Sequence, residues 1–253
     1  MLVLSEWRNG ALSANGNGRL DVTGGDIVVN SASRAAAKTN GDGVVLVSAP
    51  GQTRVTGQST GGGFNPSAIH GADPVDDPLV DFEMPDTGSM PSRSSSGGVL
   101  QPGVYNGPVD IHDRDVVLEP GLYVLREGLT LSGDGSLTGT GVTIINTVGS
   151  GGDGDASCGL IRFSGEATFS LSAPTDGDYA GLLIYQDPSC DVALTVAGGA
   201  SGAAIGTVHI SGGAIEVGDQ AELGGVQLIA DRIKTSGAAS IQLVFDRNSV
   251  AGR

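Results

Sequence analysis

Hydrophobic and polar residues alternate with period two along this chain, but only in very short pieces. Each piece has three or four residues, and turn residues such as Gly, Asn, Asp and Ser follow it. Alternation over so few positions predicts a short β-strand with one buried face. The clearest pieces are 20–22, 26–29, 44–47, 109–111, 129–131, 142–144, 208–210, 215–217 and 241–243.

The predicted strands return at an interval of about seven residues, which is shorter than the 8–12 residues typical of hairpin sandwiches. Three short strands and three corners at this interval complete a solenoid coil of about 20–22 residues. The chain is therefore predicted to be an all-β, single-stranded parallel β-helix, right-handed because parallel crossovers nearly always have that hand. One run of first apolar residues is Val109, Val116, Leu122, Leu129, Leu137 and Val142.

Composition agrees with a narrow coil interior. Gly occurs 43 times, whereas Phe, Trp and Tyr together make up only 4% of the residues. Small aliphatic side chains fill a thin interior, and Gly, Asn and Asp accept the positive φ angles of tight corners. The same composition argues against long helices.

We expect one β-helix domain over 1–253, with coils in 9–57 and 99–246. The segment 58–98 breaks the pattern with five of the eleven prolines and predicts a long irregular excursion. Its apolar residues indicate that part of it covers the flank of the helix; they are Leu79, Val80, Phe82 and Met84. Trp7 is predicted to pack over the open end of the first coil, with sugar stacking as the weaker alternative.

The net charge and the two cysteines restrict which partners and which cellular compartment the sequence predicts. The net charge of −15 repels phosphate backbones, so we expect no nucleic acid partner. The first residues are too briefly apolar for a leader or a membrane span, and we expect neither in this chain. Cys158 and Cys190 predict one disulfide in an oxidising compartment, and two buried free thiols are the alternative.

One dense group of charged residues invites a catalytic interpretation. Glycan-active β-helices need two or three carboxylates on adjacent strands of one face. The run 110–115 places its charges where one predicted strand ends and the next begins, so a solvated corner is the favoured interpretation. Its charged and titratable residues are Asp110, His112, Asp113, Arg114 and Asp115.

Metal sites receive little support from the sequence. The run 151–155 resembles a Ca²⁺-binding Gly-Asp repeat but has no second copy, and an acidic loop is the favoured interpretation. Weak Ca²⁺ candidates are Asp153, Asp155, Asp176 and Asp178, with Asp187 nearby in sequence. His70, His112 and His209 lack a His or Cys partner at metal-ligand spacing, so we expect no transition metal and no cofactor.

A series of longer motifs occurs in a recognisable order along nearly the whole chain. They are NGALSANGN at 9–17, GDIVVNSAS at 25–33, DPL at 77–79, PGVY at 102–105, PGLYVL at 120–125, GTGVTI at 139–144, YAGLLIYQD at 179–187 and QLIAD at 227–231. In this order they resemble the extracytoplasmic part of bacterial TadE/TadG-like proteins associated with Flp (Tad) pilus assembly. That family typically joins one N-terminal transmembrane helix to a Gly/Ser-rich, β-rich ectodomain and offers no catalytic motif to transfer.

The resemblance and the missing catalytic pattern lead to a non-enzymatic structural or interaction module, extracytoplasmic in the cell envelope, at the surface or secreted. An envelope or pilus-related protein is the expected partner. Copies of the chain can also associate, either end to end through exposed coil edges or by side packing. An ice-binding or adhesin-like β-helix is the first alternative, and it requires ranked Thr or small residues on one flat face. The Thr residues concerned are Thr130, Thr138, Thr140, Thr143, Thr207 and Thr235. A polysaccharide-active enzyme is the second alternative.

Overall fold

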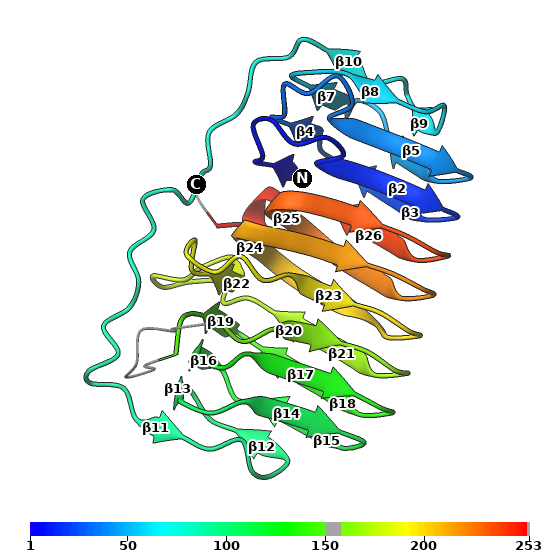
Figure 1. Cartoon of the computed structure of the whole chain (residues 1–253). Helices are drawn as coiled ribbons and strands as arrows, with labels where there is room; N and C mark the ends of the chain where they lie inside the picture. The colour runs from blue at the N-terminus through cyan, green and yellow to red at the C-terminus, as the bar shows by residue number, and fades with distance from the viewer. Residues whose placement is uncertain (150–157, 252–253) are drawn as a thin grey trace.

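The computed structural model describes residues 1–149 and 158–251, and its strands stack into one tall parallel solenoid (Figure 1). Residues about 20 positions apart lie side by side, as Val109 does with Leu129 and Leu194 with Ile215. No α-helix occurs in these two described ranges. The predicted parallel β-solenoid is confirmed.

Each coil has three faces, which we name by what covers them. The strap face holds β1 (Leu2–Val3), β4 (Ile27–Val29), β7 (Thr53–Val55), β10 (Ile69–His70), β11 (Ser92–Arg93), β13 (Gly103–Tyr105), β16 (Gly121–Leu125), β19 (Val142–Asn146) and β22 (Leu182–Gln186). The charged face holds β2 (Leu12–Gly16), β5 (Ala37–Gly41), β8 (Ser59–Thr60), β14 (Val109–His112), β17 (Leu129–Ser132), β20 (Ile161–Phe163) and β23 (Leu194–Val196).

The third face, the open face, completes every coil. It holds β3 (Arg19–Thr23), β6 (Val44–Val47), β9 (Phe64–Asn65), β12 (Val99–Leu100), β15 (Asp115–Leu118), β18 (Ser136–Thr140), β21 (Thr168–Ser172) and β26 (Ser240–Val244). Two long strands, β24 (Ser201–Val217) and β25 (Glu222–Thr235), bend round all three faces. A short 3₁₀ turn, η1 (Arg247–Ser249), follows β26.

The core is a set of inward-facing stacks, because alternate residues of every strand point to the axis. In one stack Phe169 lies beside Gly202, where any Cβ would overlap the backbone and ring of Phe169. The glycine therefore makes room for an aromatic ring in a narrow interior. The full stack is Val116, Leu137, Phe169, Gly202, Leu223, Ile241, Leu20, Val45 and Phe64.

The two stretches of coils are joined out of chain order. Near the C-terminus, β26 pairs with β3, so that Val244 lies beside Thr23, and β25 pairs with both β1 and β2. The solenoid thus begins at β11 and β12, rises to β26 and continues through β1 to β10. The first and the last strand of the chain, β1 and β26, consequently lie within the rod and not at its two ends (Figure 1).

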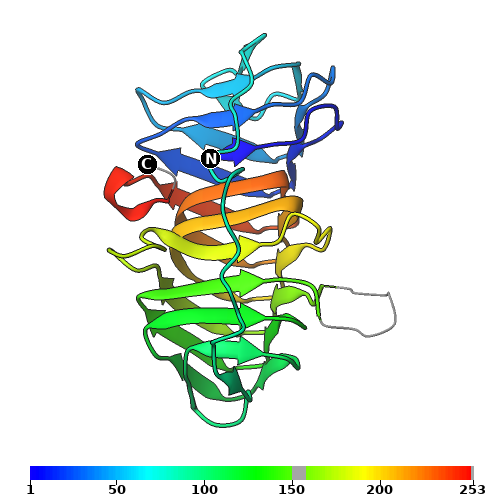
Figure 2. The ribbon, with the colours of Figure 1, turned by 90° about the vertical axis from the view of Figure 1, so that its left-hand side faces the viewer.

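Residues 71–91, which we call the strap, return from one end of the rod to the other along its outside (Figure 2). The excursion is shorter than the predicted 58–98, because β8, β9 and β10 form a further coil over 59–70. Its predicted covering role holds in part: Leu79 is buried and Phe82 partly buried, whereas Val80 and Met84 are exposed.

The prediction that Trp7 caps the first coil is wrong. Its side chain is 76% exposed, and its corner between β1 and β2 lies in the middle of the rod. The reason is the order of stacking: the first coil of the chain is not the first coil of the solenoid.

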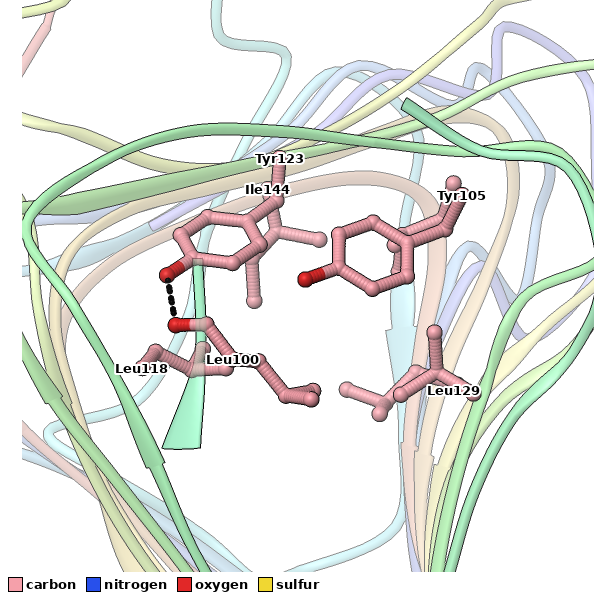
Figure 3. Close-up of a pocket in the computed structure, with 8 residues that line it drawn as sticks. Leu100, Tyr105, Leu118, Tyr123, Leu129 and Ile144 are labelled. Atoms are coloured by element: carbon pink, nitrogen blue, oxygen red, sulfur yellow. Dashed lines mark hydrogen bonds between the residues drawn. The ribbon is translucent and has the colours of Figure 1, made fainter. Parts of the chain in front are cut away.

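At the β11 end, two tyrosines fill the interior of the coil (Figure 3). The hydroxyl oxygen of Tyr123 lies 2.8 Å from the carbonyl oxygen of Leu100 and 2.7 Å from that of Glu119, and its single proton is shared between these two acceptors. Tyr105 donates to the carbonyl oxygen of Gln101 at 2.7 Å. The remaining cavity of about 10 Å³ is apolar and no larger than one water molecule, so it is a packing gap rather than a ligand site.

Cutting the strap tests how the two stretches are held. We expect a protease site inserted after Gly88 to yield two fragments that still co-elute as one 25.2 kDa particle, because backbone pairing of β25 and β26 with β1 to β3 persists. Size-exclusion chromatography after cleavage, with the uncut protein as reference, gives the measurement. Separation of the fragments in native buffer would contradict this arrangement.

Candidate interaction surface

The strap face is already covered. Leu79 of the strap lies in a buried apolar cluster with the outward-facing side chains of successive coils, and Phe82, Met90 and Tyr179 pack against it. This apolar surface is therefore satisfied within the chain. The other members of the cluster are Val104, Val124, Ile145, Leu182 and Tyr185.

Polar contacts fix the upper part of the strap. Both carboxylate oxygens of Asp77 lie 2.9 and 3.0 Å from Nε2 of His209, a side chain that is 1% exposed. The imidazole stacks on Tyr185 with ring centres 4.9 Å apart, and Phe82 of the strap packs on the same tyrosine at 4.2 Å. Higher up, the amide of Asn30 exchanges two hydrogen bonds with the backbone of Val75.

Electrostatics at this anchor favour the ionised carboxylate. Burial acts to raise the pKa of Asp77, but hydrogen bonds from His209 and from the backbone N–H of Leu79 outweigh it and lower the pKa below its ordinary value. Burial, together with the charges of Asp77 and Asp187, raises the pKa of Tyr185 to about 12. The strap is thus held by a charged contact as well as by apolar packing.

The charged face carries long side chains of both signs. Lys234 and Glu216 lie side by side in register, and Arg162 lies beside Thr130, which in turn lies beside Asp110. Exposed charges of mixed sign are well solvated, and the ion pairs that they form contribute little free energy. This face therefore has the character of a solvent-exposed surface.

The open face differs from both. In the three coils that contribute β18, β21 and β24, this face presents three columns of uncharged side chains, all of them small except Ile205. Strands of a sheet lie about 4.8 Å apart and alternate residues about 7 Å apart, so these side chains form a flat lattice. The rows are Ser136, Thr138 and Thr140 in β18, Thr168, Ser170 and Ser172 in β21, and Ser201, Ala203 and Ile205 in β24.

Aliphatic side chains extend the lattice toward both ends. Val117 and Val99 continue the column of Thr138 toward the β12 end of the rod, and they are 47% and 56% exposed. Ile205 and Val244 lie higher, at 41% and 63% exposed. Exposed aliphatic side chains in line with one another on a sheet form an apolar surface that another surface can cover.

The predicted Thr residues do not gather on one face. Thr138 and Thr140 lie on the open face, and Thr130 lies on the charged face. Thr143 is buried and donates its hydroxyl proton to the carbonyl oxygen of Leu182, while Thr207 and Thr235 are fully buried. The lattice positions are filled by Ser as well as by Thr, with Ala203 and Ile205 in the upper row.

The cluster at 110–115 forms a corner. Asp110 and His112 point outward from β14, and Asp113 occupies the turn with φ of 50°. Arg114 donates to three backbone carbonyl oxygens, and Asp115 accepts a hydrogen bond from Ser136 at 2.6 Å. These side chains are engaged in holding the turn and the segment below it, which matches the favoured interpretation of a solvated corner.

Of the predicted Ca²⁺ ligands, Asp153 and Asp155 lie outside the described residues. Asp176 and Asp178 are exposed, and Asp187 accepts hydrogen bonds from Thr147 and Ser189. Within 1–149 and 158–251 no three His, Cys, Asp or Glu side chains are grouped as metal ligands would be. His70 contacts Ser59 and His112 contacts Ser132, so the three histidines lie in different places.

Cys158 and Cys190, which are 32 positions apart in the sequence, form a disulfide as predicted. It ties the loop before β20 to the loop before β23. A bond of this kind suits an oxidising, extracytoplasmic compartment. In the part of the chain that the structure describes, no helix has the length and apolarity to cross a membrane.

No family model, curated protein or solved structure matches this chain.

The Asp77 anchor yields a pH-dependent prediction. Because the pKa of Asp77 is lower in the folded than in the unfolded chain, its stabilising effect is complete above about pH 4 and is lost as the pH falls through the folded pKa. We expect Asp77→Asn to reduce the free energy of unfolding by about 2 kcal/mol at neutral pH and by much less in acid.

Urea unfolding of both proteins over a pH series gives the measurement, with Asp81→Asn on the exposed part of the strap as the control. The anchor would be contradicted if the two proteins had the same free energy of unfolding at neutral pH, or if the difference between them were as large in acid as at neutral pH.

Proposed function

We propose that this chain is a non-enzymatic structural and interaction module of the bacterial cell envelope or surface, of the type that the Tad pilus-associated resemblance implies. Its docking surface is the open face, and its partner is an envelope or pilus-related protein. The observation that carries the proposal is the exposure of a flat, small-residue sheet on a rod whose apolar strap face is covered by its own strap.

Physical properties of the open face support this role. Ser, Ala and Thr lose little side-chain entropy when they are buried, so a rigid face made of them docks at a low entropic cost. The exposed valines and Ile205 supply apolar area at the same surface. The disulfide adds support for an extracytoplasmic location.

The chemistry of the densest acidic group also favours a non-enzymatic role. Glycan hydrolysis requires carboxylates that face a shared substrate groove, one of them as a general acid. Asp113 and Asp115 instead accept hydrogen bonds from the next coil, at Asp134 and Ser136. Release of reducing ends or unsaturated uronates from acidic polysaccharides by the purified protein would contradict the proposal.

A second candidate function, ice binding, is favoured by one observation. The rows of β18, β21 and β24 present hydroxyl, methyl and methylene groups at regular spacing on a flat sheet. The lattice is interrupted by Asp115 below and by Glu222 and the Arg19–Asp21 ion pair above. Those charges limit the regular area, which is why this function ranks second.

Site-specific cross-linking tests the leading proposal. A photo-reactive amino acid at Thr138 is expected to give an adduct with an envelope protein in cells that express the native gene, and the adduct should disappear with Ser170→Arg. The same group at Thr130, on the charged face, is the matched control and should give none. Equal adducts from both positions, or none from Thr138, would overturn the open face as the docking surface.

Freezing behaviour separates the two functions. The leading proposal predicts no thermal hysteresis in a solution of the purified protein. Ice binding predicts hysteresis and shaped crystals that Ser170→Tyr abolishes and Thr130→Tyr leaves intact, because only the former disrupts the lattice. Hysteresis with that pattern would replace the leading proposal with the second.

A further inference from the structure

A hollow of about 500 Å³ opens where the strap crosses the N-terminal coils, away from the open face. Leu4, Glu6 and Trp7 form one wall, from the corner after β1. The strap lines the hollow through 74–77, and Asn30, Ala32 and Thr56 complete the lining. We propose that this hollow binds the cationic side chain of an arginine or lysine in a basic segment of a partner protein.

Trp7 is the first reason. It is the only tryptophan, and its side chain is 76% exposed, whereas Tyr105, Tyr123, Phe163 and Tyr185 are each 2% exposed. Leaving an indole in water forgoes roughly 1.5–3 kcal/mol of burial free energy. In the described ranges no other ring packs against Trp7, so its face is available to a ligand.

The charge of the lining is the second reason. The three ionisable residues that line the hollow are Glu6, Asp76 and Asp77, all acidic. Asp77 is occupied by His209, but the carboxylates of Glu6 and Asp76 take part in no ion pair among the residues that the structure describes. Arg8 is close in sequence yet pairs with Asp231 at 3.4 Å.

The walls are held in place before any ligand arrives. The two hydrogen bonds between Asn30 and Val75, at 2.8 and 2.9 Å, fix the strap next to Asp76. The carbonyl oxygen of Glu6 accepts a hydrogen bond from Ala32 at 2.7 Å, and Ser31 binds the carbonyl oxygen of Arg8 at 2.8 Å. A preorganised site loses less entropy on binding.

These features together select a cation. A guanidinium or ammonium group binds over an indole face and forms charge-assisted hydrogen bonds with carboxylates, and Arg suits both contacts best. An anionic ligand would be repelled by the same carboxylates. A neutral sugar would stack on Trp7 but would leave the negative charge uncompensated.

Because Trp7 is the only tryptophan, its fluorescence reports directly on the hollow. Titration of the full chain with a tetra-arginine peptide is expected to give a saturable change in emission. Tetra-citrulline, which has nearly the same shape without charge, and chitotetraose should give none. A change with citrulline equal to that with arginine, or saturation by chitotetraose alone, would overturn the proposal.

Paired variants separate this site from general attraction to an acidic protein. Glu6→Gln combined with Asp76→Asn should weaken tetra-arginine binding about tenfold. Asp176→Asn combined with Asp178→Asn removes the same charge from an exposed loop and should change it little. Equal weakening in both pairs, or no saturable signal from correctly folded wild type, would refute the site.

Trp7→Phe provides an independent readout by calorimetry, where a weaker but measurable affinity is expected. Thermal unfolding of every variant checks that the coils are intact. The hollow is separate from the open face, so the cross-linked adduct at Thr138 should still form in the Glu6→Gln/Asp76→Asn variant. The cross-linking result and the peptide-binding result therefore test the two proposals independently.

Discussion

Backbone hydrogen bonds between β25 and β26 on one side and β1, β2 and β3 on the other determine the rest of this structure. The amide of Leu4 donates to the carbonyl oxygen of Ala230 at 2.8 Å, and the amide of Phe245 donates to that of Thr23 at 2.9 Å. These bonds join residues more than 200 positions apart into continuous ladders. The interior stack passes through the junction without a gap, from Ile241 to Leu20.

The position of the junction explains the strap and the surfaces. Since the N-terminal coils sit on the C-terminal ones, the chain must return from the upper end to the lower end before the second stretch can begin. The returning segment covers one apolar face and is anchored through Asp77 and His209. The open face remains uncovered, and the place where the strap crosses the first coils creates the hollow beside Trp7.

The sequence predicts the local structure well because strand and corner signals are local. Alternation at 109–111 or 241–243 reflects a side chain inside and its neighbour outside, whatever coil lies next to it. The disulfide could also be predicted from the sequence, since two cysteines have only one possible pairing.

The order of the coils could not be predicted in the same way. Every coil has nearly the same pattern, so β3 fits on β26 as well as any other coil would, and nothing in the alternation specifies this neighbour. The exposure of Trp7 and the contact of Asp77 with His209, 132 positions apart, both follow from that order. The open-face lattice was not predicted, because the Thr residues singled out in the sequence lie on different faces or in the interior, and only Thr138 and Thr140 belong to it.

Cross-linking across the junction is the most direct test of the stacking order. Thr23→Cys with Val244→Cys places two exposed thiols on neighbouring strands, whereas Asn65→Cys with Val99→Cys places them at opposite ends of the rod. Treatment with a short bis-maleimide and peptide mapping should link 23 to 244 and leave 65 and 99 unlinked. A link between 65 and 99 without one between 23 and 244 is the result for coils stacked in chain order, and it would contradict this account.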